Sequence, residues 1–294
     1  MLCSMTTFFD FSPAAVTELA WLDTARALQE DVGPGDLTAG LIDSARLVKA
    51  RVLAREAAVI CGAPWAEAAL KQLDPGVQVD WLVAEGQRCT PDQVVLELWG
   101  GARTLLTAER TVLNFLQLLS AVATKTADYV AAVQAVPGNR AQIVDTRKTL
   151  PGLRLAQKYA VRMGGGTNHR IGLYDAVLIK ENHIAAAGGV SAVLKRALEV
   201  APTAKFIEIE VETLAQLAEA LNAGATMVLL DNMDLATLRE AVVLNAGRAI
   251  LEVSGGVNMG TVREIAATGV DRISIGALTK DVKAIDFSMR MQEL

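Results

Sequence analysis

The stretch from Asp145 to His183 is dense in side chains that can bind anions. It holds seven Lys or Arg and three Asp or Glu, within a chain whose formal net charge is −5. Both histidines of the protein, His169 and His183, also lie in it. Cationic groups at this density are typical of a pocket for a multiply charged anion, although a solvated basic face is the simpler alternative.

The positions of three of these cations favour the pocket. Arg147 and Lys148 follow the apolar segment 143–144, and Lys180 follows the apolar segment 176–179. Both segments have the composition of buried strands. Cations at the ends of buried strands lie close to the protein interior, so we expect them to bind a substrate anion.

Two acids, Glu210 and Asp231, end successive apolar runs further along the chain. Mg²⁺ typically binds through one or two carboxylates together with substrate phosphate oxygens and water. The pair therefore predicts a magnesium site facing the basic pocket, with structural salt bridges to the cations as the alternative. The sequence has no Cys/His ligand set, so zinc is not expected.

Glycines follow the last two apolar runs, in Ser254-Gly255-Gly256 and Gly276-Ala277. Glycine lets a ligand approach the backbone closely, and loops after the last strands of a barrel often bind phosphate. Simple turns are the alternative. A phosphate cradle, a metal site and a cation cluster together indicate a sugar phosphate bearing pyrophosphate and a polyanionic acceptor, with stabilisation of separated charge as the mechanism. No Ser–His–Asp or Cys–His set is evident, which disfavours nucleophilic catalysis.

Short apolar runs alternate with helical patterns after Pro137-Gly138, which predicts a parallel sheet. The later run ends are regularly spaced, with 21, 23 and 22 residues separating Glu210, Asp231, Ser254 and Gly276. The runs are 142–146, 175–180, 206–211, 226–231, 249–254 and 272–276, with helices expected near 153–163, 190–200, 212–223, 234–245 and 260–268.

An open doubly wound sheet and a β/α barrel both fit this alternation. The barrel is favoured because nearly every run ends in a functional group, and only a barrel brings all strand ends to one mouth. Six runs are fewer than eight, so the barrel would be incomplete, or its missing strands would leave no clear pattern in the sequence. The first 115 or so residues predict a mixed α+β unit, with helices at 13–30 and 63–73 and strands at 47–60, 77–83 and 94–100. The segment 102–135 predicts one long helix or a pair of helices.

Composition narrows the class of protein. Hydrophobic residues make up 52% and charged residues 21%, as in soluble globular proteins. Aromatic residues are only 4%, and with the net acidity this argues against a nucleic-acid partner. Cys3, Cys61 and Cys89 show no disulfide or metal spacing, which predicts a reducing compartment. Residues 1–16 lack a basic n-region and no apolar run could span a bilayer, so we expect a cytoplasmic protein without a membrane partner.

Several motifs together resemble the quinolinate phosphoribosyltransferase family. They are DTRKTLPGLR (145–154), KYAVRMGGGTNHRIGLYDAVLIKENHI (158–184), IEVE (209–212), LLDN (229–232), LEVSGG (251–256) and GALTK (276–280). The resemblance extends upstream to EDVGPGDLT (30–38) and to the helix 105–124, and so covers nearly the whole chain.

The resemblance implies a fold and an activity. The fold is an incomplete TIM-like β/α barrel, at 116–280, with an N-terminal α+β sandwich domain at 1–115 that the tail 281–294 rejoins. The activity is transfer of phosphoribosyl from phosphoribosyl pyrophosphate to quinolinate with decarboxylation, giving nicotinate mononucleotide, carbon dioxide and pyrophosphate in de novo NAD biosynthesis. The family needs Mg²⁺ and works as homodimers or larger homo-oligomers.

The resemblance also assigns roles to residues. Lys148, Glu210 and Asp231 would be catalytic, and Glu210 and Asp231 would hold the Mg²⁺ and the ribose hydroxyls. The quinolinate carboxylates and pyrophosphate would be held by Arg147, Lys148, His169, Arg170 and Lys180, and the 5′-phosphate by Ser254, Gly255 and Gly276. Arg110, which by its own segment could be an ordinary surface residue of a helix, would enter the neighbouring subunit's site.

Two other functions remain open. A related phosphoribosyltransferase-like protein could act on another aromatic acid, as does the relative found with molybdate transport genes. The intact Asn168-His169-Arg170 motif favours quinolinate, because a substrate with two carboxylates needs those donors. A non-catalytic sensor of phosphoribosyl pyrophosphate or an NAD precursor is disfavoured by the presence of Lys148, His169 and Glu210.

Overall fold

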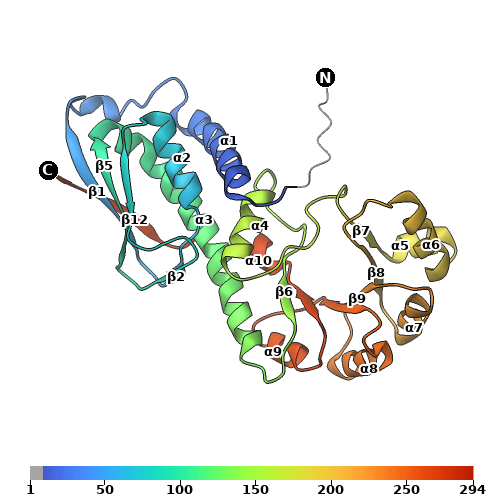
Figure 1. The fold of residues 1–294 in the computed structure, drawn as a ribbon. Helices are drawn as coiled ribbons and strands as arrows, with labels where there is room; N and C mark the ends of the chain where they lie inside the picture. The colour runs from blue at the N-terminus through green and yellow to red at the C-terminus, as the bar shows by residue number, and fades with distance from the viewer. Residues whose placement is uncertain (1–8, 294) are drawn as a thin grey trace. The chain divides into compact units, whose positions relative to one another are not determined.

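The computed structural model describes residues 9–293, which form two compact units (Figure 1). The first unit comprises the chain up to Lys125, Leu150–Gly165 and the chain from Asp281 onward. The second comprises Thr126–Thr149 and Gly166–Lys280. The expectations for Cys3 and for the first eight residues of the N-terminal segment lie outside the described residues.

The first unit is built on a four-stranded sheet in the order β12-β1-β5-β3, and every neighbouring pair is antiparallel. In β1 buried residues alternate with more exposed ones, because successive side chains point to opposite faces of a strand. The buried face packs on helices α2 and α3 in one hydrophobic core that includes Val52, Leu98 and Leu116. The elements are α1 (Pro13–Val32), η1 (Ala39–Leu41), β1 (Leu47–Ala54), β2 (Ala58–Val59), α2 (Ala63–Leu73), β3 (Gln78–Trp81), β4 (Arg88–Cys89), β5 (Val94–Gly101), α3 (Ala102–Gln134, which continues into the second unit from Thr126), α4 (Arg154–Met163) and β12 (Phe287–Glu293).

Helix α1 begins where its sequence predicts. The Ser12 hydroxyl accepts from the Ala15 backbone N–H at 3.4 Å, and Pro13 occupies the first turn, where its missing N–H costs nothing. At the other end of the chain, β12 pairs with β1 along its length, from Phe287 opposite Ala54 to Glu293 opposite Val48. The tail thus supplies the edge strand of the first unit's sheet.

The second unit is a six-stranded parallel sheet in the order β6-β11-β10-β9-β8-β7. Strands β7 to β11 lie side by side in chain order, with no reversal, which is barrel topology rather than a doubly wound sheet. This confirms the expected incomplete barrel. The strands are β6 (Gln142–Val144), β7 (Val177–Ile179), β8 (Ile207–Val211), β9 (Met227–Asp231), β10 (Ile250–Ser254) and β11 (Arg272–Ser274).

Helices follow most of these strands and lie along the outer side of the sheet (Figure 1). Thr213 and Asp234 cap α7 and α8, each accepting from a backbone N–H of the first turn. The helices are α5 (Glu181–Ala187), α6 (Val190–Val200), α7 (Leu214–Asn222), α8 (Leu235–Asn245), α9 (Val262–Ala266) and α10 (Ala277–Lys280). With helices on one side, alternate side chains of each strand face the enclosed side, where a site can form.

Residues 150–165 belong to the first unit, whereas the sequence-based boundaries placed them in the barrel. In α4, Lys158 is fully buried and Tyr159 lies over Trp65 with ring centroids 5.4 Å apart. An amphipathic pattern predicts that a helix buries one face but not which unit receives it. The expected strand at 47–60 is also divided, into β1 and β2.

Two further expectations concern the cysteines and membrane-spanning segments. Cys61 and Cys89 are free thiols, and both are buried. Among residues 9–293, no helix combines the length and the apolar character needed to cross a membrane.

Candidate active site

A cavity of about 280 Å³ lies at the carboxyl ends of the parallel strands in the second unit. Seven residues selected from the sequence line it: Arg147, Lys148, His169, Arg170, Lys180, Glu210 and Ser254. Thr146, Leu178, Leu229, Glu252 and Ser274 complete the lining. Four cations and two acids therefore face one cavity, which leaves it positive.

The cations and the acid nearest the opening form the mouth group, which we define as Arg147, Lys148, Arg170, Lys180 and Glu210. Lys180 Nζ lies 2.9 Å from Glu210 Oε2, and the Lys180 side chain is 46% exposed. An ion pair this exposed contributes little to stability, so the carboxylate can exchange its partner when a ligand binds.

Arg170 is a cation held in a largely buried position. Its guanidinium donates to the Ala176 backbone oxygen at 3.2 Å. Burial first, and then the neighbouring positive charge of Arg147, lower the pKa of Arg170 below its ordinary value. Two guanidinium groups that repel each other beside a cavity are stabilised when an anion enters between them.

The turn that carries Arg170 is anchored by Asp145, the first residue after β6. Asp145 Oδ1 accepts from the His169 backbone N–H at 2.9 Å, and Oδ2 accepts from Asn168 Nδ2 at 2.6 Å. Asp175 holds the following residues, accepting from the Ile171 and Gly172 backbone N–H groups at 2.9 Å. The basic motif is thereby fixed by fully buried carboxylates at both ends.

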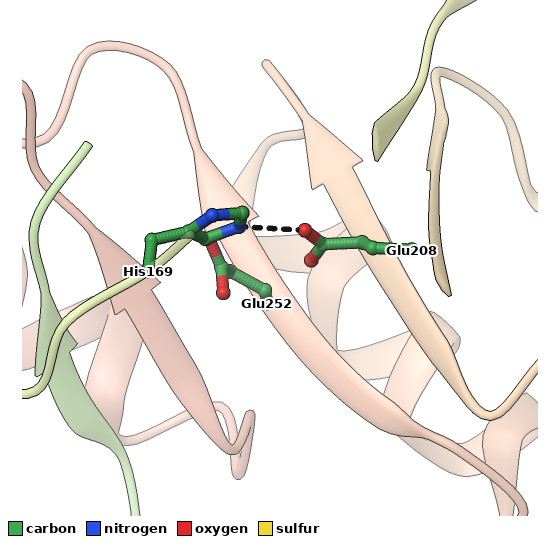
Figure 2. A group of neighbouring side chains, drawn as sticks. All are labelled: His169, Glu208 and Glu252. Carbon is green, nitrogen blue, oxygen red and sulfur yellow. Dashed lines mark hydrogen bonds and ion pairs between the residues drawn. The ribbon is translucent and has the colours of Figure 1, made fainter. Parts of the chain in front are cut away.

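A second set of charges lies deeper, on the inner face of the sheet, and we define His169, Glu208, Glu252 and Arg272 as the floor group. His169 Nε2 is 2.7 Å from Glu208 Oε2 and 3.6 Å from Glu252 Oε1. Figure 2 shows the imidazole directed toward Glu208, with the Glu252 carboxyl group beside the ring. Arg272 Nε lies 2.9 Å from Glu252 Oε2, so this acid has its own cation.

The floor carboxyl groups have shifted proton affinities. Burial raises the pKa of Glu208 to about 7. Burial, with the nearby Glu208 charge as the next cause, raises the pKa of Glu252 to about 7. Both side chains are 0% exposed, and desolvation of a charged carboxylate is the dominant cost.

The other predicted site residues lie beside this cavity rather than in its lining. Asp231 ends β9 and pairs in register with Ser254 on β10. Gly255 follows, at φ +95°, and a Cβ there would overlap the side-chain oxygen of Asn232. A Cβ at Gly276 would stand 2.9 Å from Lys148 Cδ. Both glycines thus allow a close approach that other residues would block.

Arg110 is an exposed residue of α3 in the first unit and does not line the cavity. Sequence reasoning missed three residues of the floor group: Glu208, Glu252 and Arg272. Their signal is the two-residue period of a strand. Glu208 precedes Glu210 by two residues and Glu252 precedes Ser254 by two, so each faces the same side as a residue selected for function.

The donor set at the mouth suits magnesium. Glu210 and Asp231 are carboxylates on adjacent strands, where Val211 pairs with Leu230; Glu210 is the last residue but one of β8 and Asp231 is the last of β9, so both lie at the same edge of the sheet. Oxygen ligands of this kind, completed by phosphate oxygens and water, are those that Mg²⁺ prefers. Three residues of the floor group, His169, Glu208 and Glu252, place ligand atoms within 4.8 Å of one another.

Comparisons with known proteins agree with this architecture. Residues 36–120 and 122–290 match the family models described as the N-terminal and C-terminal domains of quinolinate phosphoribosyl transferase. A Bacillus subtilis (strain 168) protein named probable nicotinate-nucleotide pyrophosphorylase (carboxylating) is 41% identical over 260 residues, covering 88% of this chain and 89% of that protein.

Solved structures are similar over almost the whole chain. The nicotinate-nucleotide pyrophosphorylase of Francisella tularensis has a TM-score of 0.91 at 41% identity, covering 98% of this chain and 100% of that one. NadC of Streptococcus pyogenes has a TM-score of 0.90 at 40% identity, with 97% and 99% covered. The resemblance predicted from the motifs is confirmed, and the chain belongs to the quinolinate phosphoribosyltransferase family.

Proposed function

We propose that this protein transfers the phosphoribosyl group of phosphoribosyl pyrophosphate to quinolinate, forming nicotinate mononucleotide, carbon dioxide and pyrophosphate. It is then a pentosyltransferase of NAD biosynthesis. Its relatives carry names for this reaction, such as nicotinate-nucleotide pyrophosphorylase (carboxylating) and quinolinate phosphoribosyltransferase (decarboxylating). They cover most of this chain at about 40% identity.

The observation that carries the proposal is the excess of positive charge in one cavity. Arg147, Lys148, Arg170 and Lys180 line it together, and Arg170 is largely buried beside Arg147. Quinolinate has two carboxylates and phosphoribosyl pyrophosphate has a pyrophosphate group, so both substrates are polyanions. Charge-assisted hydrogen bonds to such groups are the strong ones, particularly where water is excluded.

The chemistry follows from stabilising charge as it separates. The bond from ribose C1 to pyrophosphate breaks, the leaving group takes the electron pair, and the cations of the mouth group bind the charge that develops on it. The pyridine nitrogen of quinolinate donates its lone pair to C1. The bond from C2 of the quaternised ring to its carboxylate then breaks. The electron pair stays on C2 beside the positive nitrogen, carbon dioxide leaves, and C2 takes a proton.

Glu210 and Asp231 would hold Mg²⁺ and the ribose hydroxyls, and Ser254, Gly255 and Gly276 would hold the 5′-phosphate. Bound Mg²⁺ would offset negative charge on pyrophosphate. A Cβ at Gly255 would meet the Asn232 side chain and one at Gly276 would meet that of Lys148, so both glycines let polar side chains lie against the backbone where we place the phosphate.

The assignment is tested with purified protein, quinolinate, phosphoribosyl pyrophosphate and Mg²⁺, following nicotinate mononucleotide and carbon dioxide. We expect equal amounts of the two products, and none when either substrate is omitted. Nicotinate in place of quinolinate should give little product, because it lacks the second carboxylate. Absence of turnover with quinolinate, together with activity on nicotinate, would overturn the assignment.

The protein would act as a homodimer or larger homo-oligomer in which Arg110 enters the neighbouring subunit's site. Arg110 is exposed on α3, one turn after Thr107, whose hydroxyl donates to Asp36 Oδ2 at 2.8 Å. The segment held by that contact, which includes η1, exposes Leu37 at 92% and Leu41 at 83%. Apolar side chains this exposed are of the kind that subunit interfaces bury, and a two-fold dimer would deliver one Arg110 to each site.

Mixing two inactive variants tests the donation of Arg110. In a mixed dimer of Arg110→Ala and Lys148→Ala subunits, one site lacks both groups and the other is intact. Random reassortment makes about half of the dimers mixed, so roughly a quarter of wild-type activity should return. If subunit exchange is verified by mass and no activity reappears, Arg110 does not act across the interface.

A further inference from the structure

His169 is held at both ring nitrogens by groups of its own chain. The Arg170 backbone N–H donates to His169 Nδ1 at 2.8 Å, and His169 Nε2 lies 2.7 Å from Glu208 Oε2. A ring nitrogen that accepts a hydrogen bond carries no hydrogen, so the ring hydrogen is on Nε2. His169 therefore donates to Glu208, and Glu208 accepts.

The burial of Glu208 is energetically unfavourable. This residue is 0% exposed, and its second oxygen, Oε1, has no hydrogen-bond partner within residues 9–293. A buried carboxylate with unused hydrogen-bonding capacity costs free energy that an apolar side chain would not. This cost indicates that Glu208 contributes something other than stability.

The contact with His169 links the sheet to the mouth group. Glu208 is fixed in β8, between β7 and β9. His169 belongs to the turn whose next residue, Arg170, lines the cavity. One hydrogen bond from Arg170 reaches the ring and one from the ring reaches the sheet, so the position of the ring sets that of the Arg170 backbone.

A metal ion in the floor group is disfavoured by the same hydrogen bonds. A cation bound at His169 Nε2 would move the ring hydrogen to Nδ1, where it would face the Arg170 N–H. The Nδ1–H and the Arg170 N–H would repel each other, and the turn that carries Arg170 would have to move. In addition, the guanidinium of Arg272 already lies 2.9 Å from Glu252 and supplies a positive charge there.

We propose that Glu208 is a positioning residue, which holds His169 in a single tautomer and orientation and thereby holds Arg170 for the carboxylates of the substrate. The identity of that substrate rests on the proposed function, whereas the tautomer does not. Glu252 and Arg272 are the charged groups that surround the hydrogen bond between His169 and Glu208, and neither needs to contact His169 for Glu208 to have this role.

The tautomer is measured by NMR of the imidazole nitrogens with ¹⁵N-histidine. The chain has only two histidines, and His183→Asn assigns the remaining set of signals to His169. In the wild type at pH 7.5 we expect Nε2 of His169 to carry hydrogen and Nδ1 to show the far-downfield shift of an unprotonated nitrogen. An averaged or reversed pattern, or one that shifts on addition of Zn²⁺ alone, overturns the proposal.

Two matched variants test the acceptor. Glu208→Gln keeps a carbonyl oxygen for Nε2–H, so the His169 pattern and the KM for quinolinate should stay within about two-fold of wild type. Glu208→Leu removes the acceptor, so the pattern should average and the KM for quinolinate should rise at least ~10-fold, with the KM for phosphoribosyl pyrophosphate changed less. Equal damage in both variants, or to both KM values, overturns a positioning role.

The readouts separate this inference from the proposed function. If the protein does not turn over quinolinate but shows the expected tautomer in the wild type and in Glu208→Gln, the proposed substrate is wrong and the positioning geometry stands. If Glu208→Leu does not fold, the spectra of the wild type and of Glu208→Gln decide. A single Nε2–H tautomer in both proteins supports the proposal, and any other pattern contradicts it.

Discussion

Glu208 and Glu210 face the same side of β8, yet their surroundings differ. Glu210 lines the cavity with its side chain 11% exposed, and its partner is the exposed Lys180. Glu208 is 0% exposed and its partner is His169, itself only 7% exposed. A step of two residues along a strand thus separates a group that can exchange partners for a ligand from one that cannot.

The same step recurs on β10, where both residues line the cavity but Ser254 is partly exposed at the strand end and Glu252 is fully buried. Barrel interiors are usually filled by branched apolar side chains, whereas this one buries two carboxyl groups and a guanidinium. From this comparison we propose that the mouth group binds substrate and that the floor group holds the mouth group in place. Changes in the two groups should therefore have different consequences.

The largest effect is expected from removing a cation of the mouth group. Arg147→Ala or Lys148→Ala should lower kcat/KM at least ~100-fold, because each loses a charge-assisted contact worth ~3 kcal/mol in a site shielded from water. The free energy of unfolding should hardly change, since relief of repulsion among the cations offsets lost packing. Steady-state kinetics and urea denaturation measure the two quantities.

Lys195→Ala is the matched control, because Lys195 is an exposed residue of α6 and the variant loses the same charge. It should keep wild-type activity. Turnover within a few-fold of wild type in either mouth variant would show that the cavity is not the substrate site.

A smaller effect is expected from weakening the metal site. Activity should vanish with a chelator and return with Mg²⁺, and Glu210→Gln and Asp231→Asn should each need ~10-fold more Mg²⁺ for half-maximal activity. Titration of activity with Mg²⁺ measures this. Glu240→Gln, an exposed change on α8, should match the wild type. Full activity in the presence of chelator would refute the magnesium assignment.

Titration of the floor group should affect the free energy of unfolding rather than the binding of anions. Burial raises the pKa of Glu252 from 4.5 to about 7, so the folded protein binds more protons than the unfolded chain between these values. Stability should therefore be highest at the acidic end of this window and fall as the pH rises toward 7. For one group the loss is on the order of 2–3 kcal/mol.

Glu252→Gln removes this titration, so its free energy of unfolding should vary less with pH than that of the wild type. Urea denaturation at several pH values from 5 to 8 compares the two slopes, and Glu240→Gln, which loses an exposed carboxylate, should keep the wild-type slope. If the free energy of unfolding of Glu252→Gln varied with pH as steeply as that of the wild type, Glu252 would not be the group whose raised pKa causes the dependence.

Much of the second unit could be predicted from the sequence. All six expected parallel strands are present, and the helix expected at 190–200 has those bounds. Continuous apolar runs with regular spacing are a strong signal, because strands covered on both faces tolerate few polar residues. The ends of these runs also predicted several of the cations and acids that line the cavity.

The floor group could not be predicted with the same ease. Glu208 and Glu252 interrupt apolar runs, and a single acid in a strand is as consistent with an exposed edge as with the interior. Their burial depends on what covers that face of the sheet, and Glu208 is covered in part by His169, whose ring nitrogen lies 2.7 Å from its carboxylate. The place of 150–165 is likewise decided by packing of Tyr159 on Trp65, which no local pattern encodes.

The central claim is that the cations of the mouth group recognise a substrate with two carboxylates. Calorimetric titration of the wild-type protein with quinolinate and with nicotinate tests it most directly, because the two ligands differ by one carboxylate. The second carboxylate should gain a charge-assisted contact of about 1.5–3 kcal/mol, so quinolinate should bind at least ~10-fold more tightly. Equal affinities, or tighter binding of nicotinate, would contradict the claim.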